Sequence, residues 1–226
     1  MTMDIYLDIE TLPTLDPDVI AEIAKTITPP ATMSKAETIA AWEAEKKPDL
    51  VKQAVAKTSF DGMYGSIACI AWAINDGKPI CVDCREGEGP MIETFFAHVA
   101  EQIRDADVAD SGTRTFIGHN VAEFDLQFLR HRAIIHGIKP PRPILHAMTA
   151  KPWDSCIGDT MLMWSSSRER RVSLDKLCRA LGIPGKDGFD GSMVAETWPV
   201  DPKKVMEYCM DDVRRVREVY KRLVFR

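Results

Sequence analysis

Hydrophobic and polar residues alternate strictly near the N-terminus of the chain, in the stretch DIYLDIE. Ile5, Leu7 and Ile9 fall on one side of this alternation, and the other side carries Asp4, Tyr6, Asp8 and Glu10. A period of two residues is typical of a β-strand with one buried face. The pattern therefore predicts a strand with Asp8 and Glu10 side by side near its end, on the face opposite its apolar residues.

Further apolar runs and helical periodicities predict the secondary structure of most of the remaining chain. The expected elements are strands at 66–74, 79–84 and 113–120, helices at 90–105 and 121–137, and mostly helical structure over 157–225. Strands come first as a set, and strands then alternate with helices. This order predicts an α/β fold in which a mixed central sheet is flanked by helices.

The segment 13–63 interrupts this pattern with prolines and many charged residues. Within it, residues 34–47 predict an exposed helix whose first turn has Ser34 and Glu37 at the spacing of a capping box. The segment is too short and too polar for a core of its own. We therefore expect a single domain over 1–226, with 13–63 as a polar helical insertion packed on the main body.

Composition narrows the class of protein. The chain is 45% hydrophobic and 28% charged, as in an ordinary globular domain. Its longest apolar run, 67–74, is far short of the roughly 20 residues of a membrane span, and the N-terminus does not resemble a signal peptide. We expect a cytoplasmic protein with no membrane partner. The six cysteines lie mostly in apolar runs, which indicates reduced thiols.

Two further carboxylates interrupt apolar helix stripes. Asp125 falls within the stripe of the helix expected at 121–137, and Asp212 falls on that of the C-terminal helix, one turn after Tyr208. A buried carboxylate without a partner costs several kcal/mol, so each of these acids needs a ligand or a partner. For Asp125 alone, a hydrogen bond from a backbone amide or an ion pair with an arginine is the alternative explanation.

Four acids from three separate elements are thus expected to point inward, namely Asp8, Glu10, Asp125 and Asp212. Carboxylate oxygens are the ligands of hard divalent cations such as Mg²⁺ and Mn²⁺. Two such ions about 3.5–4 Å apart catalyse in-line phosphoryl displacement. The net charge of −5 does not exclude a nucleic-acid partner, because bound cations would neutralise part of it.

Three motifs carry a resemblance to a known family. YLDIET, GHNVAEFDLQFL and YCMDDV resemble, in order, the D-x-E, N-x-x-x-F-D and Y-x-x-x-D motifs of the DEDD superfamily of 3′–5′ exonucleases. The matching residues are Asp8, Glu10, Asn120, Phe124, Asp125, Tyr208 and Asp212. A tyrosine four residues before the last aspartate resembles the tyrosine class. More closely, the chain looks like the freestanding form of the family B DNA polymerase proofreading domain found in phage and bacterial genomes, to which KDGFDGSMV at 186–194 is also similar.

The resemblance implies a ribonuclease H-like fold and a 3′–5′ exonuclease with two divalent metal ions, Mg²⁺ or Mn²⁺. Its implied substrate is a DNA 3′ end, single-stranded or frayed, with RNA as an alternative and 5′-mononucleotides as products. The four acids would hold the metals, and Tyr208 would orient the attacking water. Thr11, Leu12 and Asn120 are expected to contact the terminal nucleotide. Protein partners are not predicted.

Several polar residues outside these motifs allow two interpretations. The basic stretch 165–171 and the pair Arg130 and Arg132 are candidates for phosphate contacts, and a solvated surface explains them equally well. Asp159 is expected to cap a helix, and His119 is expected to form local hydrogen bonds.

Two rival functions also account for the four acids. One is another two-metal nuclease of the ribonuclease H-like fold, either an endonuclease or a short-RNA exonuclease. The other is a catalytically silent module that binds nucleic acid. Dependence on a free 3′ end separates the first rival from an exonuclease, and stabilisation by Mn²⁺ tests the second.

Overall fold

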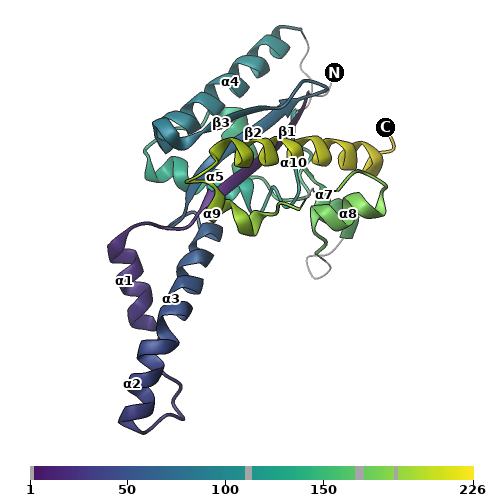
Figure 1. The fold of residues 1–226 in the computed structure, drawn as a ribbon. Helices are drawn as coiled ribbons and strands as arrows, with labels where there is room; N and C mark the ends of the chain where they lie inside the picture. The colour runs from purple at the N-terminus through teal and green to yellow at the C-terminus, as the bar shows by residue number, and fades with distance from the viewer. Residues whose placement is uncertain (1–2, 110–113, 166–170, 186–187) are drawn as a thin grey trace. The chain divides into compact units, whose positions relative to one another are not determined.

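A computed structural model of the chain describes residues 3–109, 114–165, 171–185 and 188–226. The chain divides into two compact units (Figure 1). The first unit comprises residues 1–10 and 67–226, and the second comprises residues 11–66. The predicted single-domain organisation stays a prediction.

The described part of the first unit is built on a five-stranded sheet in the order β3-β2-β1-β4-β5. The strands are β1 (Met3–Leu12), β2 (Ser66–Ile74), β3 (Ile80–Asp83), β4 (Arg114–Gly118) and β5 (Ile157–Asp159). The helices are α4 (Glu88–Ala109), α5 (Asp125–Ile135), α6 (Arg142–Thr149), α7 (Thr160–Ser165), α8 (Leu174–Ala180), α9 (Val194–Thr197) and α10 (Pro202–Leu223), with the short 3-10 turns η2 (Cys84–Glu86) and η4 (Gly191–Met193). The pairs β1–β4 and β4–β5 are parallel and β2–β3 is antiparallel, so the sheet is mixed.

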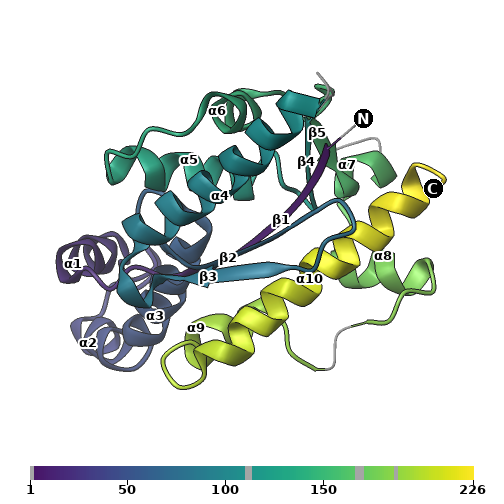
Figure 2. The ribbon, with the colours of Figure 1, turned by 90° about the horizontal axis from the view of Figure 1, so that it is seen from above.

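The alternation predicted for β1 separates two faces of the sheet. Ile5, Leu7 and Ile9 belong to the hydrophobic core together with residues of α4, α5 and α6. Burial of each of these side chains stabilises the fold by about 1.5–3 kcal/mol. On the opposite face, the Tyr6 ring packs edge-on against Tyr220 of α10, with ring centroids 6.1 Å apart. Figure 2 shows α4 and α5 on one side of the sheet and α10 on the other. Asp8 and Glu10, on the same strand face as Tyr6, therefore face α10.

The helix α10 has clear start and stop signals. The side chain of Asp201 accepts a hydrogen bond from the backbone N–H of Lys204 at 3.1 Å, and Pro202 occupies the first helical position. Lys221 and Arg222 lie in the last turn, where positive charge favours the helix dipole. Among the described residues, no helix combines the length and the apolar character that a membrane span requires.

The helix predicted over 121–137 begins four residues later than expected, at Asp125. Asn120 has a left-handed backbone with φ of 67°, and residues 121–124 form turns, in which the N–H of Phe124 bonds the carbonyl of Asn120. Asparagine tolerates this backbone region better than most residues. As a consequence, Asp125 occupies the first position of α5 and not the middle of a helical stripe.

The described part of 157–225 is mostly helical, as predicted. The exception is its start, where residues 157–159 form β5, which pairs with β4. A strand of three residues is too short to show a period in the sequence. The helix expected at 90–105 is confirmed as part of α4, and its apolar stripe is buried.

The second unit is helical. It contains α1 (Pro17–Thr26), α2 (Ala36–Glu45), α3 (Lys47–Ala56) and the 3-10 turn η1 (Lys57–Phe60), and α3 packs against both α1 and α2. The hydroxyl of Thr58 accepts a hydrogen bond from the N–H of Thr14 at 2.8 Å and donates to the carbonyl of Val55 at 2.7 Å. The capping box predicted at Ser34 is wrong, because α2 begins after Lys35 without a side-chain cap.

Candidate active site

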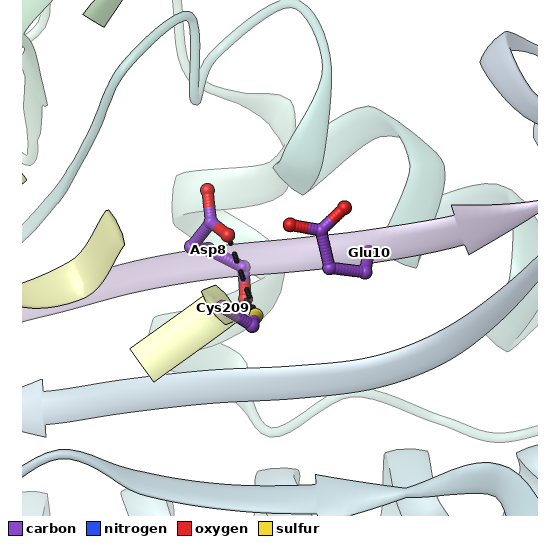
Figure 3. Close-up of side chains that lie close together, drawn as sticks. All are labelled: Asp8, Glu10 and Cys209. Atoms are coloured by element: carbon purple, nitrogen blue, oxygen red, sulfur yellow. Dashed lines mark hydrogen bonds between the residues drawn. The ribbon is translucent and has the colours of Figure 1, made fainter. Parts of the chain in front are cut away.

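Asp8 and Glu10 project from β1 toward α10, where they meet Cys209 (Figure 3). The Cys209 Sγ atom lies 3.3 Å from Asp8 Oδ2 and 3.4 Å from the backbone oxygen of Asp8. One oxygen of each carboxylate and this sulfur all lie within 4.8 Å of one another. The thiol therefore donates a hydrogen bond that orients the Asp8 carboxylate.

Asp125 reaches the same strand from α5. Its side chain is 4% exposed, and its Oδ1 accepts a hydrogen bond at 3.1 Å from the N–H of Ile9, the residue between Asp8 and Glu10. Burial raises the pKa of Asp125 to about 8; the negative charges of Asp159 and Asp212 add to the increase, and backbone hydrogen bonds oppose it. The backbone hydrogen bond weighed as an alternative is thus present, and it ties this acid to β1.

Asp212 is the inward member of two adjacent acids on α10. It is 6% exposed, and its Oδ1 lies 2.9 Å from Nη1 of Arg215. The Nη2 atom of Arg215 donates a second hydrogen bond, to the carbonyl of Gly185 at 3.2 Å. The side chain of Asp211 is 44% exposed and pairs with Arg214. One positive charge therefore already compensates Asp212 within the described part of the chain.

The four predicted acids share one electrostatic environment. Desolvation raises the pKa of Asp8 well above its ordinary value, and the charges of Glu10, Asp212 and Asp125, in that order, raise it further. Like charges at close range disfavour ionisation of the cluster unless cations neutralise them. The donors are hard carboxylate oxygens in excess over nearby positive charge, and this chemistry fits divalent cations.

Tyr208 lies one turn before Asp212 on α10. Its ring packs edge-on against Phe189, with centroids 4.8 Å apart. Burial raises the pKa of Tyr208 well above its ordinary value; the charge of Asp212 comes next, and a hydrogen bond with that carboxylate adds to the increase. The hydroxyl is therefore protonated at neutral pH and acts as a hydrogen-bond donor.

Asp159, at the end of β5, accepts more hydrogen bonds than the predicted helix cap requires. Its carboxylate, 1% exposed, accepts from the N–H groups of Met161 and Leu162 at 3.1 and 3.3 Å, so the predicted helix cap is confirmed. It also accepts from the N–H groups of Asn120 and Ala122 at 3.1 and 3.3 Å. Asp159 thereby fixes the turn that precedes α5. A buried acid after a short apolar run was the only sequence signal for this second set of bonds.

The three predicted substrate contacts lie in different parts of the structure. Asn120 belongs to the turn before α5, next to the acid cluster in the chain. Thr11 and Leu12 belong to the second unit, in which the hydroxyl of Thr11 donates to the carbonyl of Ser59 at 2.7 Å. Contact of these residues with a nucleotide stays a prediction.

The basic residues proposed for phosphate contacts are placed differently from one another. The prediction for Arg132 is wrong, because its guanidinium is 12% exposed and bonds both oxygens of Glu88, the closer at 2.7 Å. Residues 166–170 of the stretch 165–171 lie outside the described residues, and Arg171 pairs with Glu123 at 2.8 Å. The ring nitrogens of His119 form hydrogen bonds with Thr160 and with the carbonyl of Val172, in agreement with the structural role predicted for this residue.

Fold and site together define an α/β protein with a carboxylate-rich candidate active site. The chain belongs to the family described as "Predicted 3′-5′ exonuclease related to the exonuclease domain of PolB", whose model matches residues 82–225. This match contains Asp125, Tyr208 and Asp212, whereas Asp8 and Glu10 precede it.

Solved structures include a similar fold. The family B DNA polymerase from the hyperthermophilic archaeon Pyrobaculum calidifontis resembles the chain with a TM-score of 0.58 at 15% sequence identity. The similarity covers 98% of this chain and 24% of the polymerase chain, so this chain spans about a quarter of that protein's length. No match was found among curated proteins. The predicted fold class, an α/β ribonuclease H-like exonuclease fold, is confirmed.

Proposed function

We propose that the protein is a metal-dependent 3′–5′ exonuclease of the tyrosine class. It hydrolyses phosphodiester bonds from the 3′ end of DNA, at single strands or frayed ends, and releases 5′-mononucleotides. The observation that carries this proposal is that four acids from β1, α5 and α10 lie close enough for their charges to raise the pKa values of Asp8 and Asp125, in a chain of this nuclease family. DNA is the proposed substrate because the family is related to the exonuclease domain of a DNA polymerase.

The acids are the proposed ligands of two divalent cations, Mg²⁺ or Mn²⁺. Asp8, Glu10, Asp125 and Asp212 would hold these ions through their carboxylate oxygens. The chemistry that such cations supply in nucleases is a lower pKa of the attacking water and neutralisation of charge on the leaving oxygen.

The side chains around the acids have supporting roles in this proposal. Cys209 orients Asp8 through its hydrogen bond, and the N–H of Ile9 holds Asp125 against the strand. Tyr208, protonated at neutral pH, would donate a hydrogen bond to the attacking water and would not remove its proton. Asn120 would contact the backbone of the terminal nucleotide.

End dependence tests the proposal. Linear single-stranded DNA labelled at its 5′ end is incubated with the protein and Mg²⁺, alongside closed circular DNA and RNA of the same sequence. We expect the linear DNA to shorten stepwise from its 3′ end, the circle to stay intact, and a chelator to stop the reaction. Asp212→Asn should abolish the products, whereas Asp211→Asn should retain them, because that neighbour pairs with Arg214.

Other outcomes contradict the proposal and favour a rival. Cleavage of the closed circle identifies an endonuclease, and degradation confined to RNA identifies a ribonuclease. Binding of DNA without cleavage under any metal condition identifies a silent binding module.

A further inference from the structure

Phe189, between α8 and η4, is a buried aromatic residue to which the proposed mechanism assigns no role. It is 8% exposed, and its ring meets that of Tyr208 edge-on, with centroids 4.8 Å apart and planes inclined by 65°. The Nζ atom of Lys204 lies 5.1 Å from the centroid of the same Phe189 ring. Lys204, Tyr208 and Asp212 follow one another at intervals of one turn on α10, so they form a row along this helix. Phe189 therefore packs on the row that leads to the acid cluster.

The residues that follow Phe189 hold its backbone in place. Asp190 precedes η4, and its Oδ1 accepts hydrogen bonds from the N–H of Ser192 at 2.8 Å and from the hydroxyl of Ser192 at 2.5 Å. The N–H of Met193 donates to the carbonyl of Asp190 at 3.0 Å. Helix α9 follows directly and packs against α10. The Phe189 ring is thus anchored through its own chain segment and forms a wall beside Tyr208.

A tyrosine on a helix has two side-chain rotamers open to it. The χ1 angle is about 180° or about −60°, because the third rotamer clashes with the preceding turn. A change between the two rotamers swings the hydroxyl of Tyr208 to a different place. Rotation about the Cβ–Cγ bond does not move the hydroxyl, because the C–O bond lies on that axis. An edge-on aromatic pair favours its own geometry by a factor of about 2–12 beyond the effect of burial, so the contact with Phe189 selects one χ1 rotamer.

We propose that Phe189 is a positioning residue for Tyr208, because its ring keeps the Tyr208 side chain in the one rotamer that directs the hydroxyl toward Asp212. Phe189 itself contacts neither the cations nor the DNA in this proposal and acts only through the Tyr208 hydroxyl. Its effect on the nuclease rate rests on the proposed function, whereas its effect on the rotamer does not.

Three-bond NMR couplings test the rotamer in the full chain. The couplings of the tyrosine Cγ atom to its backbone nitrogen and carbonyl carbon report χ1, and the chain has four tyrosines, so Tyr208→Phe assigns the signal. We expect the values of a single rotamer in the wild type and values averaged over two rotamers in Phe189→Ala. Val194→Ala is the matched control, because it removes buried apolar volume from α9 and leaves the Phe189 ring in place. This control should keep the single rotamer.

A double-mutant cycle on the nuclease rate tests whether Phe189 acts through the Tyr208 hydroxyl. Tyr208→Phe should lower kcat about tenfold, the scale of one hydrogen bond to a charged group. Phe189→Ala should lower kcat at least about twofold, since an equal mixture of two rotamers leaves half of the molecules competent. Its effect should be no larger than that of Tyr208→Phe, and KM should stay unchanged. In the Tyr208→Phe background, Phe189→Ala should cause no further loss.

The two measurements separate this inference from the proposed function. Averaged couplings in the wild type, unchanged couplings in Phe189→Ala, or equal averaging in Val194→Ala overturn the positioning role. Losses of kcat that multiply in the double variant also overturn it. A wild type that degrades no DNA, but whose Tyr208 couplings respond to Phe189→Ala alone, contradicts only the nuclease proposal.

Discussion

Two carboxylate sites of the first unit are built in opposite ways. Glu88, at the start of α4, accepts hydrogen bonds at 2.7 Å from Arg132, His136 and the N–H of Ile67. Burial acts to raise the pKa of Glu88, but the bonds from these partners hold it below its usual range. Asp8 instead lies among three other acids, and its pKa is well above the usual range.

The difference separates an acid that completes the fold from acids that are suited to bind a cation. A carboxylate with its cation in place stabilises the folded state when charged, and removal of one partner leaves a buried charge uncompensated. Crowded carboxylates cost stability when charged, and a bound cation reverses that cost. The same change from carboxylate to carboxamide should therefore have opposite effects at the two sites.

The largest expected effect is on catalysis. Asp8→Asn should lower the rate of DNA degradation by about 10³-fold, the scale of losing one group that stabilises developing charge. Glu88→Gln should leave the rate nearly unchanged, because Glu88 bonds Arg132 and His136 and not the acid cluster. Initial rates on linear single-stranded DNA, measured well below both melting temperatures, check this contrast. An Asp8→Asn protein with full activity would contradict the assignment.

The free energy of unfolding should change in the opposite way, with the loss at Glu88 and not at Asp8. Glu88→Gln should lower the free energy of unfolding by about 3 kcal/mol, because the buried guanidinium of Arg132 loses its charge partner. For a chain of this size the melting temperature should fall by about 6–12 °C. Glu86→Gln, at an exposed acid two residues away, is the matched control and should melt like the wild type. Equal melting temperatures for the Glu88 and Glu86 variants would show that the pair contributes nothing.

Divalent cations should stabilise the protein through the acid cluster. At a Mn²⁺ concentration of about 100 times the dissociation constant, the free energy of unfolding should rise by about 2.7 kcal/mol. Asp212→Asn should reduce the thermal shift, and Asp211→Asn should preserve it. A monovalent salt of equal ionic strength is the control. A shift of equal size in both variants would place the cation elsewhere.

The smallest expected effect is a pH dependence in the presence of a chelator. The pKa of Asp125 is raised from 3.8 to about 8 in the folded state. Between these values the folded state binds more protons than the unfolded state, so the stability of the wild type falls as pH rises through this window. Asp125→Asn removes the titrating carboxyl group and with it this pH dependence, and the asparagine side chain can still accept the hydrogen bond from the N–H of Ile9. Between pH 6 and pH 7, one pH unit inside this window, the variant should therefore gain on the wild type by about 1.4 kcal/mol, and a constant difference from pH 4 to 8 would contradict the raised pKa.

Local patterns were enough to predict one side of the site. The two-residue period of β1 placed Asp8 and Glu10 opposite the apolar face, because side-chain direction in a strand depends only on position. The stripe of α10 likewise placed Tyr208 and Asp212 on a buried face, as observed. These features need no knowledge of distant residues.

Contacts between distant residues set the other side of the site. Asp159 bonds the N–H of Asn120 from 39 positions away, and this contact helps to fix the turn that delays the start of α5. Cys209 meets Asp8 across 201 positions, and its place in an apolar stripe suggested only a core residue. The pairing of Arg215 with Asp212 was also missed, since a basic residue three positions on is usual on a helix surface.

Anomalous diffraction from crystals soaked in Mn²⁺ tests the central claim most directly. We expect two anomalous peaks between the carboxylates, with oxygens of Asp8, Glu10, Asp125 and Asp212 as ligands. Anomalous peaks at other positions, or no peak beside these four acids, would contradict it.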